Sequence, residues 1–224
     1  MSHVAYYNGL KQDLKQISSL VHDKGARLFV DAYQSAGCVA IDVKEMDVDF
    51  LAAGAQKYLL GIPGIAFLYV KKELADELQP SITGWFGRID PFSFDVKSLD
   101  YAEGTRRFDT GTPPMINAYA ANAALELMNQ IGVNRIESYL NELSSFAISY
   151  GQEKGLAIAS PLDLKRKAAN TAFQCPDASR IELKMRERGV IVSARNDVIR
   201  MAPHFYNKKE EVALAIDMLC ELKS

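Results

Sequence analysis

The chain has 224 residues, 48% of them hydrophobic and 24% charged, a composition typical of a soluble globular protein. Its 26 basic and 28 acidic residues give a formal net charge of −2, which argues against general binding of nucleic acid or membranes. No apolar run approaches the roughly 18–20 residues of a membrane-spanning helix, and residues 1–10 lack the basic and apolar regions of a signal peptide, so we expect a cytoplasmic protein.

The first 70 residues alternate between helix and strand patterns. Residues 10–23 carry apolar side chains at helical spacing, and Gly25 follows where a helix would end. Three short apolar runs are continuous rather than alternating, which is typical of strands covered on both faces by helices. These runs are residues 27–31, 48–53 and 65–70. The segment therefore predicts an α/β fold with a mainly parallel sheet.

A different composition follows. Residues 79–114 are rich in glycine and proline and show no sustained period, and a loop of this length in a compact domain is usually functional. Residues 115–130 are alanine-rich and predict a helix that ends near Gly132. Residues 135–154 predict a second, amphipathic helix.

The last third mixes strand and helix patterns. We expect strands at 171–175, 190–193 and 198–202 and helices at 179–188 and 208–223. Such a mixture predicts a smaller α+β domain. We therefore divide the chain into a large-domain part with its connecting helix, residues 1–134, and a small domain, residues 135–224.

The cysteines and histidines are too scattered to predict a disulfide framework or a metal site. The cysteines form no C-x-x-C pair, and small buried side chains are the simpler interpretation for them. These residues are Cys38, Cys175, Cys220, His3, His22 and His204. No bound metal is expected.

Two neighbouring strand ends carry an acid and a lysine. Asp31 ends one apolar run and Lys57 follows the next, and ligands of open α/β sheets bind at the carboxyl ends of the strands. Partial desolvation lowers the pKa of a lysine and makes it nucleophilic. Taken alone, Asp31 is better explained as a helix cap and Lys57 as a surface lysine. Together they suit pyridoxal phosphate (PLP), whose aldehyde takes an amine and whose pyridinium nitrogen needs a carboxylate.

Residues 30–34, 49–51 and 54–70 resemble the core of the class V aminotransferases, with further matches at 107–114 and 199–207. This fold-type I PLP group includes cysteine desulfurases, kynureninases and isopenicillin N epimerase-like proteins. The resemblance runs along essentially the whole chain. It implies a remnant of the fold-type I large domain plus the smaller α+β domain. It also implies the strand order 2–7, 27–31, 48–54, 65–70.

The resemblance assigns roles by position. Lys57 resembles the lysine that holds PLP as a Schiff base and then moves the substrate α-proton. Asp31 resembles the acid that keeps the pyridine nitrogen protonated, and Gln34 the donor to the phenolic oxygen. Thr112 resembles a threonine that reaches the phosphate of the neighbouring subunit's cofactor, which implies a homodimer. Arg200 resembles the arginine that clamps the substrate α-carboxylate, although outside the family context it reads as a strand-edge surface arginine.

Three features depart from the family pattern. The chain begins inside the family's large domain, without the turn that holds the PLP phosphate at a helix N-terminus and without the group that stacks on the ring. Relatives place a serine and a histidine before the lysine, whereas this chain has Gly54 and Gln56, of which only Gln56 carries a hydrogen-bonding side chain. Residues 193–197 hold no thiol, which disfavours desulfurase chemistry.

The sequence thus predicts a PLP enzyme that acts at the α-carbon of an amino acid or keto acid, as an aminotransferase or a related lyase or epimerase. The alternative is a non-catalytic fragment or subunit, from a truncated or split gene, that binds PLP only with the missing N-terminal segment or a complementing chain. Bare edges of the retained strands favour such association. A protein unrelated to PLP would require all four motifs to coincide by chance.

Overall fold

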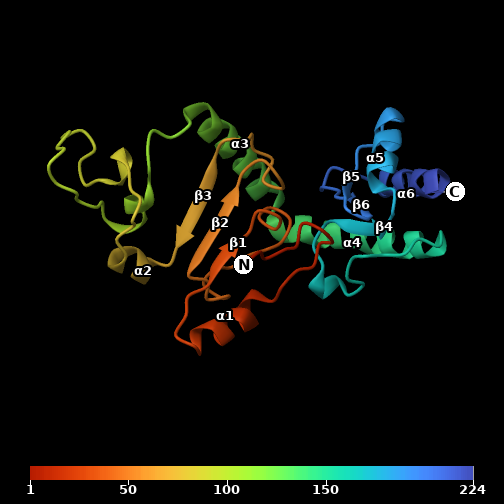
Figure 1. Cartoon of the computed structure of the whole chain (residues 1–224), viewed down its shortest axis with the longest axis horizontal. Coiled ribbons are helices and arrows are strands. Elements are labelled where there is room, and N and C mark those ends of the chain that lie inside the picture. The colour runs from red at the N-terminus through yellow and green to blue at the C-terminus, as the bar shows by residue number, and fades with distance from the viewer. Residues whose placement is uncertain (224) are drawn as a thin grey trace.

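The first sheet carries the strand ends that were singled out in the sequence. The computed structural model describes residues 1–223. β1 (Phe29–Asp31) pairs in parallel with β2 (Phe50–Gly54), which pairs antiparallel with β3 (Ala66–Val70), giving the order β1-β2-β3 (Figure 1). A parallel bridge between Ser2 and Asp31 places the start of the chain beside β1. The expected order of the four segments is confirmed, but the first predicted strand exists only as isolated bridges.

One face of this sheet is covered by α1 (Leu14–His22). The helix begins four residues later than the sequence predicts, because the Asp13 side chain accepts a hydrogen bond from the Gln16 backbone N–H at 3.0 Å and caps it. Gly25, with φ of +68°, follows its end. The buried side chains between helix and sheet are Leu14, Leu28, Val30, Ala32, Val48, Leu51 and Ala53.

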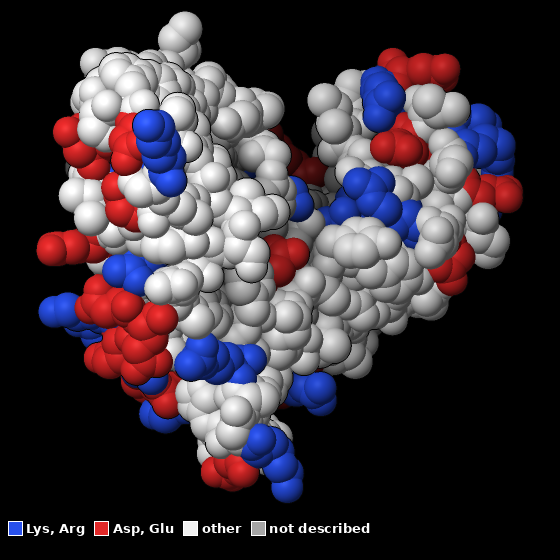
Figure 2. Space-filling model, turned by 60° about the vertical axis from the view of Figure 1, so that its left-hand side comes forward, with Lys and Arg blue, Asp and Glu red and all other residues white. Residues whose placement is uncertain are grey.

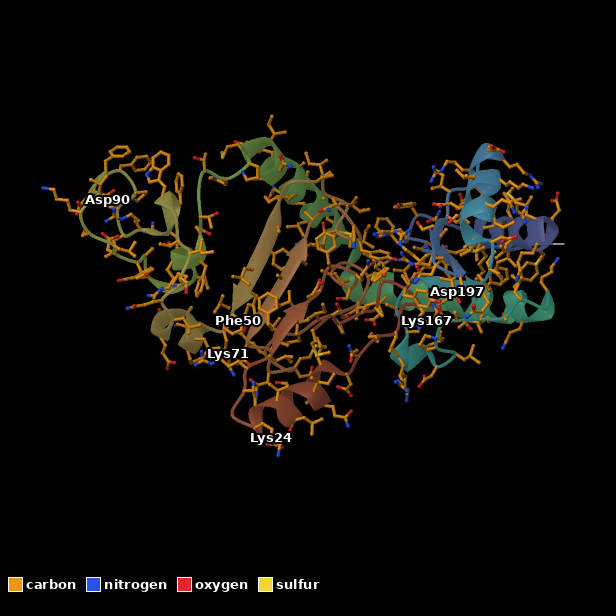
Figure 3. The ribbon with its side chains drawn as sticks, in the orientation of Figure 1. Lys24, Phe50, Lys71, Asp90, Lys167 and Asp197 are labelled. Atoms are coloured by element: carbon orange, nitrogen blue, oxygen red, sulfur yellow. The ribbon has the colours of Figure 1, made fainter. Side chains whose placement is uncertain are left out.

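The opposite face of the sheet is more open. Phe29 and Leu68, which the strand register places on this face, are 48% and 41% exposed, and the Phe29 ring stacks on Phe50 of β2 (labelled in Figure 3) with a centroid distance of 6.1 Å. The expectation that these strands are covered on both faces is therefore wrong for β1 and β3. Burial alternates along β1, and most of β3 is exposed. A short apolar run cannot by itself indicate how many layers cover a strand.

Residues 71–114 project away from the sheet (Figure 1, yellow to green). The segment contains α2 (Lys72–Glu77), which the sequence did not predict, and two 3₁₀ turns, Trp85–Gly87 and Gly104–Phe108. Parts of its backbone lie very close to one another: a Cβ on Gly84 would lie 1.6 Å from the Thr110 carbonyl oxygen. Gly84 and Gly87 therefore allow the backbone of this segment to pack closely on itself.

Two long helices lead to the second sheet. α3 (Met115–Ile131) and α4 (Val133–Glu153) meet at Gly132, whose φ is +88°. The second sheet is antiparallel, with the order β4-β6-β5, and packs against α4, α5 and α6. A 3₁₀ turn, Leu164–Arg166, precedes this part of the chain. The helices and strands that follow are β4 (Thr171–Gln174), α5 (Ala178–Glu187), β5 (Ser193–Arg195), β6 (Val198–Met201) and α6 (Lys209–Lys223). The strand expected at 190–193 is wrong, because pairing with β6 begins only at Ser193.

The larger hydrophobic cluster joins both ends of the chain. Val4, Cys38 and Tyr58 pack in the same cluster as Phe173 and Ile199 of the second sheet. The division at residue 134 falls just inside α4 and stays a prediction. Within residues 1–223, no helix combines the length and the apolar character that crossing a membrane requires.

Candidate active site

Two cavities share a wall of four side chains. One, of about 300 Å³, is lined by Asp31 and Tyr33 among others, and the second, of about 280 Å³, by Tyr58 and His204. The side chains common to both are Gln34, Lys57, Arg195 and Arg200. We treat the two cavities as one cleft on this basis. Figure 2 shows the molecule hollowed between its two lobes, with basic side chains gathered at the hollow.

The amine and the carboxylate singled out in the sequence line the same cavity. Asp31 ends β1, and its Oδ1 accepts a hydrogen bond from the Tyr33 backbone N–H at 2.9 Å. Lys57 lies in the turn after β2, and its Nζ is 4.1 Å from the centroid of the Tyr33 ring. Parallel pairing of β1 with β2 brings both strand ends to one edge of the sheet, which explains why the two residues meet.

Gly54 makes room for this arrangement. A Cβ on Gly54 would lie 2.2 Å from Cε2 of Tyr33, so any larger residue would displace the ring that lies under the Lys57 amine. The glycine at this position thus has a physical role in place of the serine expected from the family pattern.

The environment of Lys57 favours its neutral form. Burial lowers the pKa of the Lys57 amine, and the positive charges of Arg200 and Arg195 lower it further, while Asp31 acts in the opposite direction. A lysine with a lowered pKa supplies more free amine near neutral pH and is a better nucleophile.

Arg200 is a buried cation with an unused donor. It lies on β6, the central strand of the second sheet, is only 8% exposed, and its Nε has no hydrogen-bond partner. Burial, and next the charge of Arg195, lower the pKa of Arg200. The interpretation as a strand-edge surface arginine is therefore wrong. A buried orphan donor is costly unless a ligand accepts from it.

His204 connects β6 to the lysine turn and was not predicted to line the site. Its Nδ1 accepts a hydrogen bond from the Phe205 backbone N–H at 2.7 Å, so Nε2 carries the proton and donates to the Tyr58 carbonyl at 3.0 Å. Burial lowers the pKa of His204, which favours this neutral form. Its ring stacks on Tyr206 with a centroid distance of 5.1 Å. The histidine thus forms a fixed wall of the cleft.

The structure brings four of the six predicted site residues together: Asp31, Gln34, Lys57 and Arg200. Gln56 and Thr112 are exposed and line neither cavity. Tyr33 and His204 join the cleft without having been assigned a role, because only the tertiary fold brings them to Lys57, and Arg195 lines both cavities. Among residues 1–223 no cluster of three or more His, Cys, Asp or Glu side chains is suited to a metal ion.

The set of side chains fits PLP. An amine and a carboxylate line one cavity, Gln34 adds an amide donor, and the unpartnered Nε of Arg200 is available to a carboxylate. These are the groups needed for the aldehyde, the pyridine nitrogen, the phenolic oxygen and an amino-acid substrate.

Comparisons with known proteins show the family of the chain. The family model "Aminotransferase class-V" matches residues 1–214. The chain is 49% identical over 215 residues to the uncharacterized aminotransferase YcbU of Bacillus subtilis, covering 96% of this chain and 56% of that protein. It is 27% identical over 206 residues to a kynureninase of Deinococcus radiodurans, covering 89% of this chain and 50% of that protein.

A solved structure gives the same result for the fold. A cysteine desulfurase from Thermococcus onnurineus has a TM-score of 0.89 at 26% identity, covering 99% of this chain and 58% of that one. The chain thus spans about half the length of the curated relatives it matches. The fold is that of the fold-type I enzymes, and the chain belongs to the class V aminotransferase family.

Proposed function

We propose that this protein is a PLP-dependent enzyme that acts at the α-carbon of an amino acid or keto acid, as an aminotransferase or a related lyase or epimerase. The observation that carries the proposal is the placement of the Lys57 amine and the Asp31 carboxylate on one cavity. When bound, PLP supplies an electron sink that stabilises negative charge at the substrate α-carbon.

Lys57 has two tasks in this proposal. Its lowered pKa provides the free amine that attaches PLP covalently. With a substrate amine in its place, the free Nζ would hold the α-proton and return it. The Tyr33 ring beneath the amine restricts where Nζ can move.

Asp31 and Gln34 orient the cofactor ring. The carboxylate of Asp31, fixed through the Tyr33 backbone N–H, would keep a proton on the ring nitrogen, and the amide of Gln34 would donate to the phenolic oxygen. Arg200 binds the substrate carboxylate with the planar, two-pronged geometry of its guanidinium group. Its unpartnered Nε supports this role.

The phosphate requires groups outside the cleft. Thr112 is exposed and lines neither cavity, and in this proposal it reaches the phosphate bound by a second copy in a homodimer. Gln56, exposed next to Lys57, is a candidate donor within the same chain. Sedimentation of the purified chain tests the dimer: a monomer at every concentration would contradict it.

The test of the proposal is covalent trapping of PLP. The chain is mixed with PLP, reduced with borohydride and digested, and the modified lysine is identified by mass spectrometry. We expect a visible absorption band and modification of Lys57. Lys57→Ala should lose both, whereas Lys71→Ala, which removes a half-buried lysine outside the cleft, should keep both. Equal labelling of wild type and Lys57→Ala would refute the proposal. If labelling required an added N-terminal segment of a relative, the non-catalytic alternative would hold instead.

A further inference from the structure

Arg195 lies beside Arg200 in the second sheet. The β5–β6 register pairs Ser193 with Arg200 and Arg195 with Val198. Opposite residues share a face of a sheet, and so do residues two apart on one strand, so the two arginine side chains lie on the same face. They occupy diagonal positions, whose Cβ atoms are typically about 7–8 Å apart. Both side chains line both cavities of the cleft.

Positive charge in the cleft exceeds what one substrate carboxylate balances. Both Arg195 and Arg200 line it, whereas Asp31 is the acidic residue there and, in the proposed function, would pair with the protonated ring nitrogen of PLP. In the part of the chain that the structure describes, Arg195 forms no ion pair, and its guanidinium donates to the Ala194 carbonyl oxygen at 2.6 Å.

The acid closest along the chain is otherwise engaged. Asp197, in the β5–β6 turn (Figure 3), accepts a hydrogen bond from the Tyr7 hydroxyl at 2.6 Å. Two like charges at diagonal positions repel each other unless an anion lies between or beside them. The arrangement therefore has the character of an anion site with more than one cation.

Arg195 and Arg200 differ in their surroundings. Arg200 is 8% exposed and its fork is enough for one carboxylate, whereas Arg195 is exposed at the mouth of the cleft. The two positions therefore suit two separate anionic groups better than one group held twice.

We propose that Arg195 recognises a second anionic group of the substrate, and that the substrate is a short dicarboxylic amino acid or its keto acid. Arg200 takes the α-carboxylate and Arg195 the distal carboxylate. The inference rests on the proposed function, which it deepens by naming the substrate class. Arg195 is then the residue that distinguishes acidic from neutral substrates.

Binding of unreactive carboxylates to the PLP-loaded protein tests this directly. Succinate and glutarate are compared with propionate and butyrate by calorimetry, for wild type, Arg195→Gln and Arg195→Lys. The matched control is Arg180→Gln, which removes an exposed arginine of α5 outside both cavities. Since a charged hydrogen-bonded pair is involved, we expect wild type and control to prefer dicarboxylates by at least about tenfold. Arg195→Gln should lose that preference with monocarboxylate binding nearly unchanged, and Arg195→Lys should keep part of it.

Three results would overturn the assignment. If wild type shows no preference for dicarboxylates, the assignment of Arg195 to a distal carboxylate has no basis. Equal weakening of both ligand classes in Arg195→Gln shows that both arginines hold one carboxylate. A loss of PLP affinity in Arg195→Gln, measured by the absorption band, assigns Arg195 to the cofactor phosphate. Failure of the proposed function is separate from these outcomes, because it appears as an unlabelled Lys57 whatever the carboxylate preference.

Discussion

Replacing the buried Lys167 with methionine should raise the stability of the protein near neutral pH. Lys167 is only 1% exposed, and its Nζ donates to the Ser144 hydroxyl at 2.9 Å and to the Ala168 carbonyl at 3.0 Å, with no carboxylate among these partners. Burial lowers the pKa of Lys167 from 10.5 to about 7. At about 1.4 kcal/mol per pH unit, the charged amine costs the folded state on the order of 4–5 kcal/mol.

The sign of the pH dependence follows from linkage. Below pH 7 the amine is charged in both states, and the folded state bears the full cost. Between pH 7 and 10.5 the unfolded chain binds more protons, so the free energy of unfolding rises with pH by up to about 1.4 kcal/mol per unit. Cys38 acts in the opposite direction above pH 9, because burial raises its pKa to about 12. The informative window is therefore pH 7 to 8.5.

Urea denaturation at pH 6.5, 7.5 and 8.5 measures this effect. Wild type and the exposed control Lys165→Met should gain stability across the window, and Lys167→Met should lose most of that gain. At pH 6.5 we expect Lys167→Met to be more stable than wild type by about 1–3 kcal/mol. The substitution removes the cost of burying a charged amine, and the loss of its hydrogen bonds offsets part of that gain. An unchanged pH slope in Lys167→Met would refute the reasoning.

Three further predictions concern the site and the first sheet. Gly54→Ala should displace the Tyr33 ring and weaken PLP binding about tenfold or more, measured by the absorption band. The control is Gly111→Ala, because the space around Gly111 is open. Equal PLP binding by the two variants would contradict the role of Gly54. Arg200→Lys should weaken carboxylate binding about tenfold in calorimetry, because lysine lacks the planar fork, and unchanged affinity would show that Arg200 is not the clamp. His22, whose pKa is raised first by its hydrogen bond to Asp49 at 2.8 Å, stabilises the fold when protonated. This contribution is present below pH 6.5 and should fall as pH rises through the higher folded pKa; urea denaturation of His22→Gln should lack this part of the pH dependence, and an identical pH profile in the variant would contradict it.

The pair of catalytic candidates was readable from the sequence because it depends on local features. Asp31 and Lys57 each follow a short apolar run, and parallel pairing of neighbouring strands brings such ends to one edge. The order of the first sheet was predictable only from the resemblance to the class V aminotransferases. The start of α1 was misjudged because hydrophobic spacing outweighed the stronger cap signal of Asp13.

The remaining features depend on tertiary contacts. The open face at Phe29 depends on whether a second layer is present, which a strand pattern does not report. The positions of Arg195 and His204 depend on how the second sheet meets the Lys57 turn, and those segments are far apart in the sequence. From the sequence, Gly54 differs from the family pattern only by its lack of a side chain. Its contact with Tyr33 exists only in the folded chain.

A structure of the PLP-treated protein tests the central claim most directly. The account predicts continuous density between PLP and Nζ of residue 57, with the carboxylate of residue 31 at the ring nitrogen. PLP bound elsewhere, or seated in the cleft with that carboxylate turned away from the ring, would contradict it.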